Sequence, residues 1–327
     1  MRKLLVITGL LTLAASFAAA APPTASDLLR LIPEGARAIV AIDSAALRAH
    51  PVVQSWLARQ HAWAPTDETL KRFLDDAGLD PVRDVDLLLL AALGEGPETT
   101  GVAFLVGRYD PAALSSALTA RGATPVTVAG ASAFRLPDSG HCGNPAVLVQ
   151  RSADLVIVGD EAAVAAALAP PHAVSSLVAG DIAAGSVDLR APFWMVAVVP
   201  AEVRRHAGEA ANHVHGEGSD SIRGALLASG TVQKVLARAY LDDSLRFVGT
   251  AVADTAENAG LLRDAAKGAL AAVRLHVQDS SPELVDVLRS VELSAEGAVI
   301  SGKGAIPVAL LEKLVTPQKA GRAVDEL

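Results

Sequence analysis

The chain has a single cysteine and few aromatic residues. Cys142 is the only cysteine among 327 residues, so no disulfide can form within the chain and its stability must come from packing. Six Phe, three Trp and two Tyr residues leave few flat faces on which sugars or bases could stack. Because 51% of the residues are hydrophobic, we expect an aliphatic core of Ala, Val and Leu.

Positive charge is also scarce. The chain has 28 Lys and Arg residues against 36 Asp and Glu residues, which gives a formal net charge of −8. Loss of Arg2 and Lys3 with an N-terminal signal would lower this charge to −10. Phosphate backbones and anionic lipid headgroups repel such a surface. We therefore expect no nucleic-acid partner.

The N-terminus has the three-part pattern of a secretory signal peptide. Arg2 and Lys3 precede an apolar run from Leu4 to Phe17, and the small residues Ala18 to Ala20 come before Pro22. This run is shorter than the roughly twenty residues that span a bilayer. We expect cleavage after about Ala20, a periplasmic or secreted product, and no stable membrane span after cleavage. An uncleaved anchor is the alternative.

Short β-type runs alternate with capped helices through the rest of the chain. The apolar run of residues 36–42 predicts a first strand, and residues 85–93 and 101–108 predict two neighbouring strands. Further strands are predicted at residues 125–128, 132–136, 146–150, 155–158, 193–199, 291–293 and 299–302, and a hairpin across residues 242–244 is predicted to join 232–241 to 245–252. Helix starts are predicted at Asp43, Pro51, Thr66, Asp110 with Pro111 (through Ala120), Asp160, Pro200, Thr255, Pro282 and Pro307. Hairpins outnumber helix-connected parallel crossovers, which predicts an α+β fold with mixed, mostly antiparallel sheets and flanking helices.

The order of these elements recurs loosely in the second half. Each half reads as a strand, a helix, two strands, a helix, two strands and a helix, which predicts a weak internal duplication. The predicted division is a signal at residues 1–20, one α+β unit at 21–180 and a second at 187–327. The boundary is expected in the Gly-, Ala- and Ser-containing stretch of residues 178–186.

Two short stretches resemble a class of exported bacterial proteins of unknown function. They are Leu31 to Asp43, which reads LIPEGARAIVAID, and Gly107 to Leu114, which reads GRYDPAAL. The resemblance consists of a proline-containing turn, a strand, and a later helix that opens at an aspartate. It implies a repeated α+β fold and assigns no catalytic residue.

The candidate metal ligands are His206, His213, His215 and Glu217, with Asp220 nearby. Alternate residues of an extended chain point to one side, and imidazole with carboxylate suits zinc or a similar metal. Glycines surround these residues, so we interpret the segment as a solvated loop and keep a metal site as the alternative. We expect no tightly bound metal and no cofactor.

A second motif with candidate chemistry is His141-Cys142-Gly143-Asn144. A neighbouring histidine can lower the pKa of a thiol. However, adjacent residues seldom face one another, and the flanking signature of a cysteine hydrolase is missing. We interpret this segment as a turn between two strands.

Three functional classes remain open at this stage. The favoured class is a non-enzymatic binding or scaffold protein whose partner is an unknown protein or an apolar ligand. A carrier of apolar ligands or lipids is the first alternative, and a large aliphatic cavity would favour it. A metal-dependent enzyme that uses His213 and His215 is the second alternative.

Overall fold

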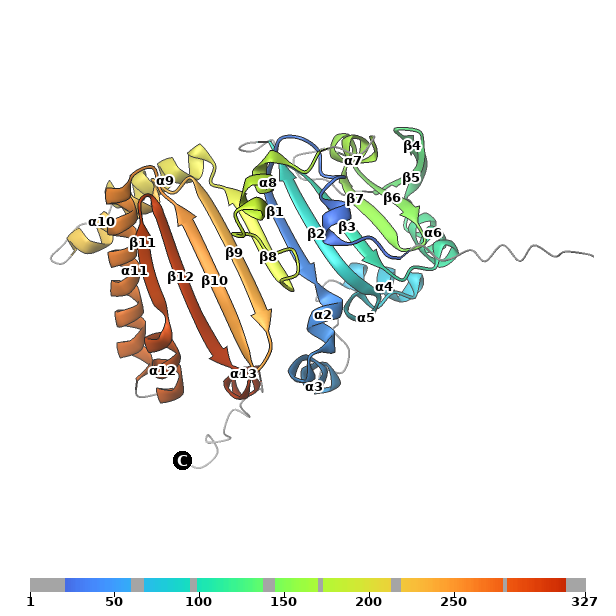
Figure 1. Cartoon of the computed structure of the whole chain (residues 1–327). Coiled ribbons are helices and arrows are strands. Elements are labelled where there is room, and N and C mark those ends of the chain that lie inside the picture. Colours follow the sequence, from blue (N-terminus) through green and yellow to red (C-terminus); the bar gives the residue numbers. More distant parts are fainter. Residues whose placement is uncertain are drawn as a thin grey trace, which may run out of the picture.

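The protein forms one antiparallel sheet flanked by helices (Figure 1). This computed structural model describes residues 21–59, 68–94, 99–137, 145–169, 173–212, 219–278 and 281–315. Twelve strands in these residues pair in the order β11-β12-β10-β9-β8-β1-β2-β3-β7-β6-β5-β4. The predicted α+β class is confirmed, and every strand pair in the described residues is antiparallel.

The strands follow the predicted apolar runs closely. They are β1 (Ala36–Asp43), β2 (Val85–Leu93), β3 (Thr100–Gly107), β4 (Thr124–Val128), β5 (Ala131–Arg135), β6 (Ala146–Ser152), β7 (Leu155–Asp160), β8 (Phe193–Val198), β9 (Lys234–Leu241), β10 (Ser244–Val252), β11 (Glu292–Glu296) and β12 (Val299–Pro307).

The helices vary from one turn to 22 residues. They are α1 (Ala25–Leu28), α2 (Ser44–Ala49), α3 (Pro51–Arg59), α4 (Glu68–Ala77), α5 (Pro81–Asp84), α6 (Pro111–Ala120), α7 (Glu161–Leu168), α8 (Ser176–Ala183), α9 (Ala201–Asn212), α10 (Ser219–Ser229), α11 (Ala256–Val277), α12 (Pro282–Ser290) and α13 (Val308–Val315). Among the described residues, none of the helices combines the length and the hydrophobicity that a membrane span requires.

The sheet is continuous across the predicted boundary because β1 pairs with β8 at its centre. Ala41 lies opposite Trp194, and Ile39 lies opposite Val196. Outward from this pair, β2 and β3 follow on one side, and β9 and β10 follow on the other. The two halves thus add strands in the same order. The division into two units and the duplication stay predictions.

One face of the sheet, which we call the α8 face, is covered by α1, α7 and α8. The side chains of Ile39, Phe104 and Trp194 point to this face and are at most 1% exposed. Val164 of α7 and Val178 of α8 are completely buried in the same cluster. As expected, this main core is built largely from Ala, Val, Leu and Ile side chains.

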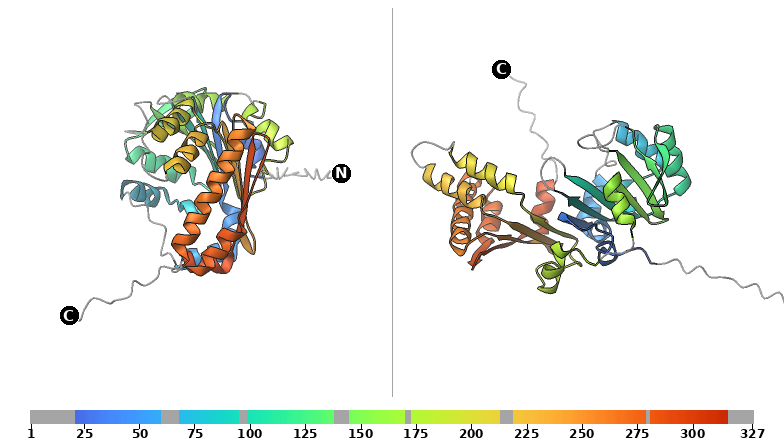
Figure 2. Two further views of the ribbon diagram at one scale, coloured as in Figure 1. Left: turned by 90° about the vertical axis from the view of Figure 1, so that its left-hand side faces the viewer. Right: turned by 90° about the horizontal axis from the view of Figure 1, so that it is seen from above.

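The opposite face, which we call the α11 face, is covered at both ends but by different helices. Leu114 and Leu118 of α6 pack in a cluster with Val156 of β7. Ala259 of α11 packs in another cluster with Ile300 of β12. The view from above in Figure 2 shows α11 on one side of the sheet and α8 on the other.

Helix α8 occupies most of residues 178–186, the stretch in which the sequence predicts the boundary between the two units. Ser175 accepts a hydrogen bond from the backbone N–H of Leu177 and caps the helix. Leu177 and Val178 are buried against the sheet. These apolar side chains pack against β1 and β8, which lie side by side.

Candidate functional site

The structure describes only one of the four candidate metal ligands. His213, His215 and Glu217 lie outside the described residues, as do His141 and Cys142. His206 is exposed on α9, within the helix that the sequence predicted after Pro200. Within the described ranges, no three His, Cys, Asp or Glu side chains gather closely enough to hold a metal ion.

The described residues form an apolar pocket of about 610 Å³ beside the end of β1. Its volume lies in the range typical of small-molecule sites, about 300–1,000 Å³. Helices α2, α3 and α5 supply most of the wall. The lining residues are Ile42, Ser44, Leu47, Arg48, Val53, Trp56, Leu57, Pro81 and Val82.

A capped helix and a partly buried ion pair fix the position of α2. The Asp43 carboxylate accepts a hydrogen bond from the Ala46 backbone N–H at 2.7 Å and starts the helix at the end of β1. At the other end of α2, Arg48 donates to the Val82 carbonyl at 2.9 Å and pairs with Asp86. These contacts hold α2 against the start of β2 and against α5.

His50 connects the pocket helices to the second half of the chain. Its Nδ1 accepts a hydrogen bond from the Val52 N–H at 3.2 Å at the start of α3. Its Nε2 lies 2.8 Å from the carbonyl oxygen of Asp242, in the turn between β9 and β10. With Nδ1 as the acceptor, Nε2 carries the proton and donates to that carbonyl. The imidazole thus joins two segments that are 192 residues apart.

An apolar strip continues from the pocket across the middle of the sheet. Ile42 lines the pocket, and its cross-strand neighbours are Phe193 on β8 and Leu88 on β2. Two residues further along β1, Val40 lies between Met195 and Leu90. Cross-strand neighbours and alternate residues share one face. Because Leu90 is 39% exposed and the other five are only half-buried, the strip is accessible from solvent.

The pocket offers binding contacts rather than catalytic groups. Among the described residues that line it, the polar side chains are Ser44 and Arg48, and none is an acid, a histidine or a cysteine. The Arg48 guanidinium is already engaged by Asp86 and by two backbone carbonyl groups. A ligand in this pocket would therefore meet mainly aliphatic carbon and the Trp56 ring.

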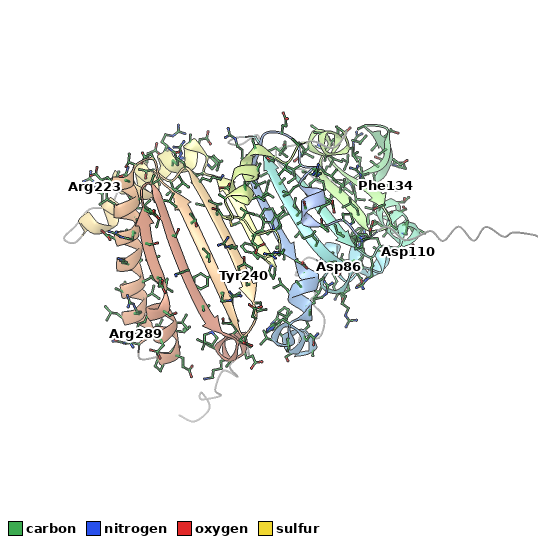
Figure 3. The ribbon with its side chains drawn as sticks, in the orientation of Figure 1. Asp86, Asp110, Phe134, Arg223, Tyr240 and Arg289 are labelled. Atoms are coloured by element: carbon green, nitrogen blue, oxygen red, sulfur yellow. The ribbon has the colours of Figure 1, made fainter. Side chains whose placement is uncertain are left out.

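A tyrosine close to this ion pair keeps its proton. Burial raises the pKa of Tyr109 far above its ordinary value, and the nearby carboxylates of Asp86 and Asp84 raise it further. Its hydroxyl is buried and has no hydrogen-bond partner among the described residues. Figure 3 shows Asp86 at the lower end of the first-half strands. The phenol is neutral at physiological pH, so the charges beside the pocket belong to the aspartates and Arg48.

Comparison with known proteins adds a distant likeness. No family model and no curated protein matches the chain. A solved structure described as crystal form I of TP0453 has a TM-score of 0.43 and 8% sequence identity over 88% of this chain and 95% of that chain. At this level of similarity the match carries no argument about function, and the chain is assigned to no family.

Sequence reasoning missed Arg48, His50 and the pocket itself. The local pattern did predict the cap at Asp43 and a helix that begins at Pro51. It could not show that Arg48 reaches Asp86 or that His50 reaches Asp242, because these partners are 38 and 192 residues away along the chain. The continuous apolar run that ends at Ile42 was the one available signal.

Proposed function

We propose that this chain is an exported, non-enzymatic binding protein that holds an apolar ligand in the pocket formed by α2, α3 and α5. The observation that carries the proposal is the 610 Å³ pocket with its aliphatic and tryptophan wall. Its lining supplies no acid, histidine or thiol in the described residues, which favours binding over catalysis.

The adjoining strip indicates the shape of the ligand. Ile42, Val40 and their neighbours extend the apolar surface of the pocket along β1 toward the middle of the sheet. Two strand residues span about 7 Å, so the strip lengthens the accessible apolar surface by at least that distance. An elongated hydrocarbon ligand would use both parts, with about 25 cal/mol gained per Å² of apolar surface removed from water.

The export part of the proposal rests on the N-terminal pattern. We expect the mature protein to begin at about Ala21 and to accumulate outside the cytoplasm of a bacterial host, because the basic start, the short apolar run and the alanines match a cleavable signal. Cell fractionation followed by N-terminal sequencing tests this expectation. Recovery of the intact 327-residue chain from the cytoplasm would contradict it.

The binding part is tested by placing a charge in the pocket wall. We expect Val53→Glu to weaken binding of the neutral fluorescent probe N-phenyl-1-naphthylamine at least ten-fold, about 1.4 kcal/mol. The reason is that a carboxylate in an apolar site either stays hydrated and fills the space or pays a desolvation cost. Fluorescence titration of the mature protein measures the dissociation constant.

Val203→Glu is the matched control. Val203 lies on α9 and is 55% exposed, away from the pocket lining, so this variant has the same change in charge and side-chain size. We expect it to bind the probe as the parent does. Absence of saturable probe binding to the parent, or equal weakening in both variants while circular dichroism shows intact folds, would disprove the pocket as the ligand site.

A further inference from the structure

The α8 face of the second half holds a basic hollow that is separate from the apolar pocket. No described helix lies in front of β10 and β12 in Figure 1, so the polar side of these strands faces solvent. A hollow of about 510 Å³ lies here. Its lining residues are Arg238, Tyr240, Arg246, Phe247, Val248, Ser290, Glu292, Lys303, Gly304 and Ala305.

The strand register places three cations around one apolar residue. Val248 on β10 lies directly between Arg238 on β9 and Lys303 on β12. Arg246 is two residues from Val248 on the same strand and therefore points to the same face. Adjacent strands are about 4.8 Å apart, so the backbones of Arg238 and Lys303 are about 10 Å apart. Three long side chains from these positions can converge on one small anion.

Two of the lining side chains are held in place by the loop after α8. Arg238 donates to the carbonyl groups of Gly185 and Ser186 at 2.7 and 3.1 Å. Tyr240 donates to the Asp188 carboxylate at 2.9 Å. Figure 3 shows Tyr240 on the strands of the second half. Burial and this hydrogen bond raise the pKa of Tyr240 above its ordinary value, so the hydroxyl stays protonated. The hollow is therefore partly preorganised.

Arg246 is positioned by an aromatic face. Its guanidinium lies 5.2 Å from the centre of the Tyr240 ring, within the range of a cation–π contact. It also pairs with Asp242 in the turn before β10. The same turn accepts the hydrogen bond from His50 through its backbone, so the position of this turn is fixed from the first half of the molecule.

The carboxylates that pair with Arg246 and Lys303 are held too weakly to exclude an anion from the hollow. Arg246 pairs with Asp242, and Lys303 pairs with Glu292 at 2.9 Å. All four side chains are more than half exposed in these pairs. Exposed ion pairs contribute about 0–1 kcal/mol each, so a multivalent anion can displace the carboxylates. Arg238, Arg246 and Lys303 line the hollow together with Glu292, and the carboxylates of Asp242 and Asp188 lie at its edge.

We propose that this hollow binds the phosphate group of a small free solute, with Arg246 and Lys303 as direct ligands beside the anchored Arg238. Arginine forks and a lysine ammonium are the groups that bind phosphate oxygens in proteins. The chain as a whole carries a charge of −8. That charge repels an extended anionic surface such as a membrane, whereas a small ion that displaces Asp242 and Glu292 contacts Arg246 and Lys303 directly.

The test uses the mature protein with inorganic phosphate as the probe. Calorimetric titration at constant ionic strength, with chloride as the replaced anion, is expected to show saturable binding. The double variant Arg246→Gln with Lys303→Gln is expected to bind phosphate at least ten-fold more weakly, because both ligand charges are lost while a polar side chain stays at each position. Both side chains are exposed, so the fold should be unchanged by circular dichroism.

Lys267→Gln is the control for a general charge effect. Lys267 is exposed on α11, on the other side of the sheet, and its removal should leave phosphate binding unchanged. Phosphate binding that is not saturable, or equal weakening by Lys267→Gln, would overturn the site. Sedimentation with phosphatidylglycerol vesicles that depends on Arg246 and Lys303 would overturn the assignment to a free solute. Binding of N-phenyl-1-naphthylamine should persist in the double variant, so the two proposals fail independently.

Discussion

Trp194→Ala is expected to destabilise the protein by about 3–5 kcal/mol, the range for removal of a fully buried aromatic side chain. Trp194 lies on β8 and is 1% exposed. Its cross-strand neighbours are Ala41 on β1 and Arg238 on β9. The ring thus fills the core where the two halves of the sheet meet, and its loss would leave a large cavity. Urea unfolding followed by circular dichroism measures the change in the free energy of unfolding.

Trp56→Ala is the matched control for this experiment. Trp56 is only half-buried and lines the apolar pocket, so its truncation removes less buried surface and leaves a space that water can enter. We expect it to cost clearly less than Trp194→Ala. Equal losses of stability in the two variants would show that the β1–β8 junction is less tightly packed than the structure indicates.

Gly159→Ala is expected to destabilise the fold by about 3 kcal/mol or more, at the upper end of the overpacking range. A Cβ atom at Gly159 would lie 2.8 Å from the Val102 Cα and even closer to the Gly101 carbonyl oxygen. These are backbone atoms of β3, the strand that pairs with β7. The steric clashes with these backbone atoms can be relieved only by separating β3 from β7. The thermal midpoint should therefore fall sharply, and soluble expression should decrease.

Gly180→Ala is the control because it makes the same chemical change where space is available. Gly180 lies in α8, and no heavy atom comes within 4 Å of the position that its Cβ would occupy. Alanine favours a helix over glycine by about 1 kcal/mol, so this variant should be as stable as the parent or more so. If Gly159→Ala matched Gly180→Ala in thermal midpoint, the close β3–β7 approach would be incorrect.

Local pattern predicted most elements because their ends are set by neighbouring residues. The helix predicted from Asp110–Pro111 to Ala120 is confirmed, and the Asp110 carboxylate accepts hydrogen bonds from the backbone N–H groups of Ala112 and Ala113. The hairpin predicted across residues 242–244 is likewise present as β9 and β10. In contrast, Asp160 precedes α7 as predicted but makes no cap, and its carboxylate instead accepts from the Gly101 N–H. That partner is 59 residues away and has no local signature.

Neither candidate site could be predicted from the sequence, because each one joins residues that are far apart along the chain. The apolar pocket joins residues 42–57 to residues 81 and 82. The basic hollow joins Arg238, Arg246 and Lys303 from three strands. In each case the sequence pattern placed the residues in strands or helices but did not indicate that they form a site. The histidine segment, which had the most distinctive composition, contributes only the exposed His206 to the described residues.

The sequence by itself determined the aliphatic composition of the core, the acidic net charge, the absence of an internal disulfide and the start of most helices. These properties follow from composition or from contacts between residues a few positions apart. Only the tertiary structure decided that β1 pairs with β8, and that Val248 lies between Arg238 and Lys303. The pairing of distant antiparallel strands is selected by which faces become buried together and by the register that this burial imposes, so it is a property of the whole sheet rather than of any one segment.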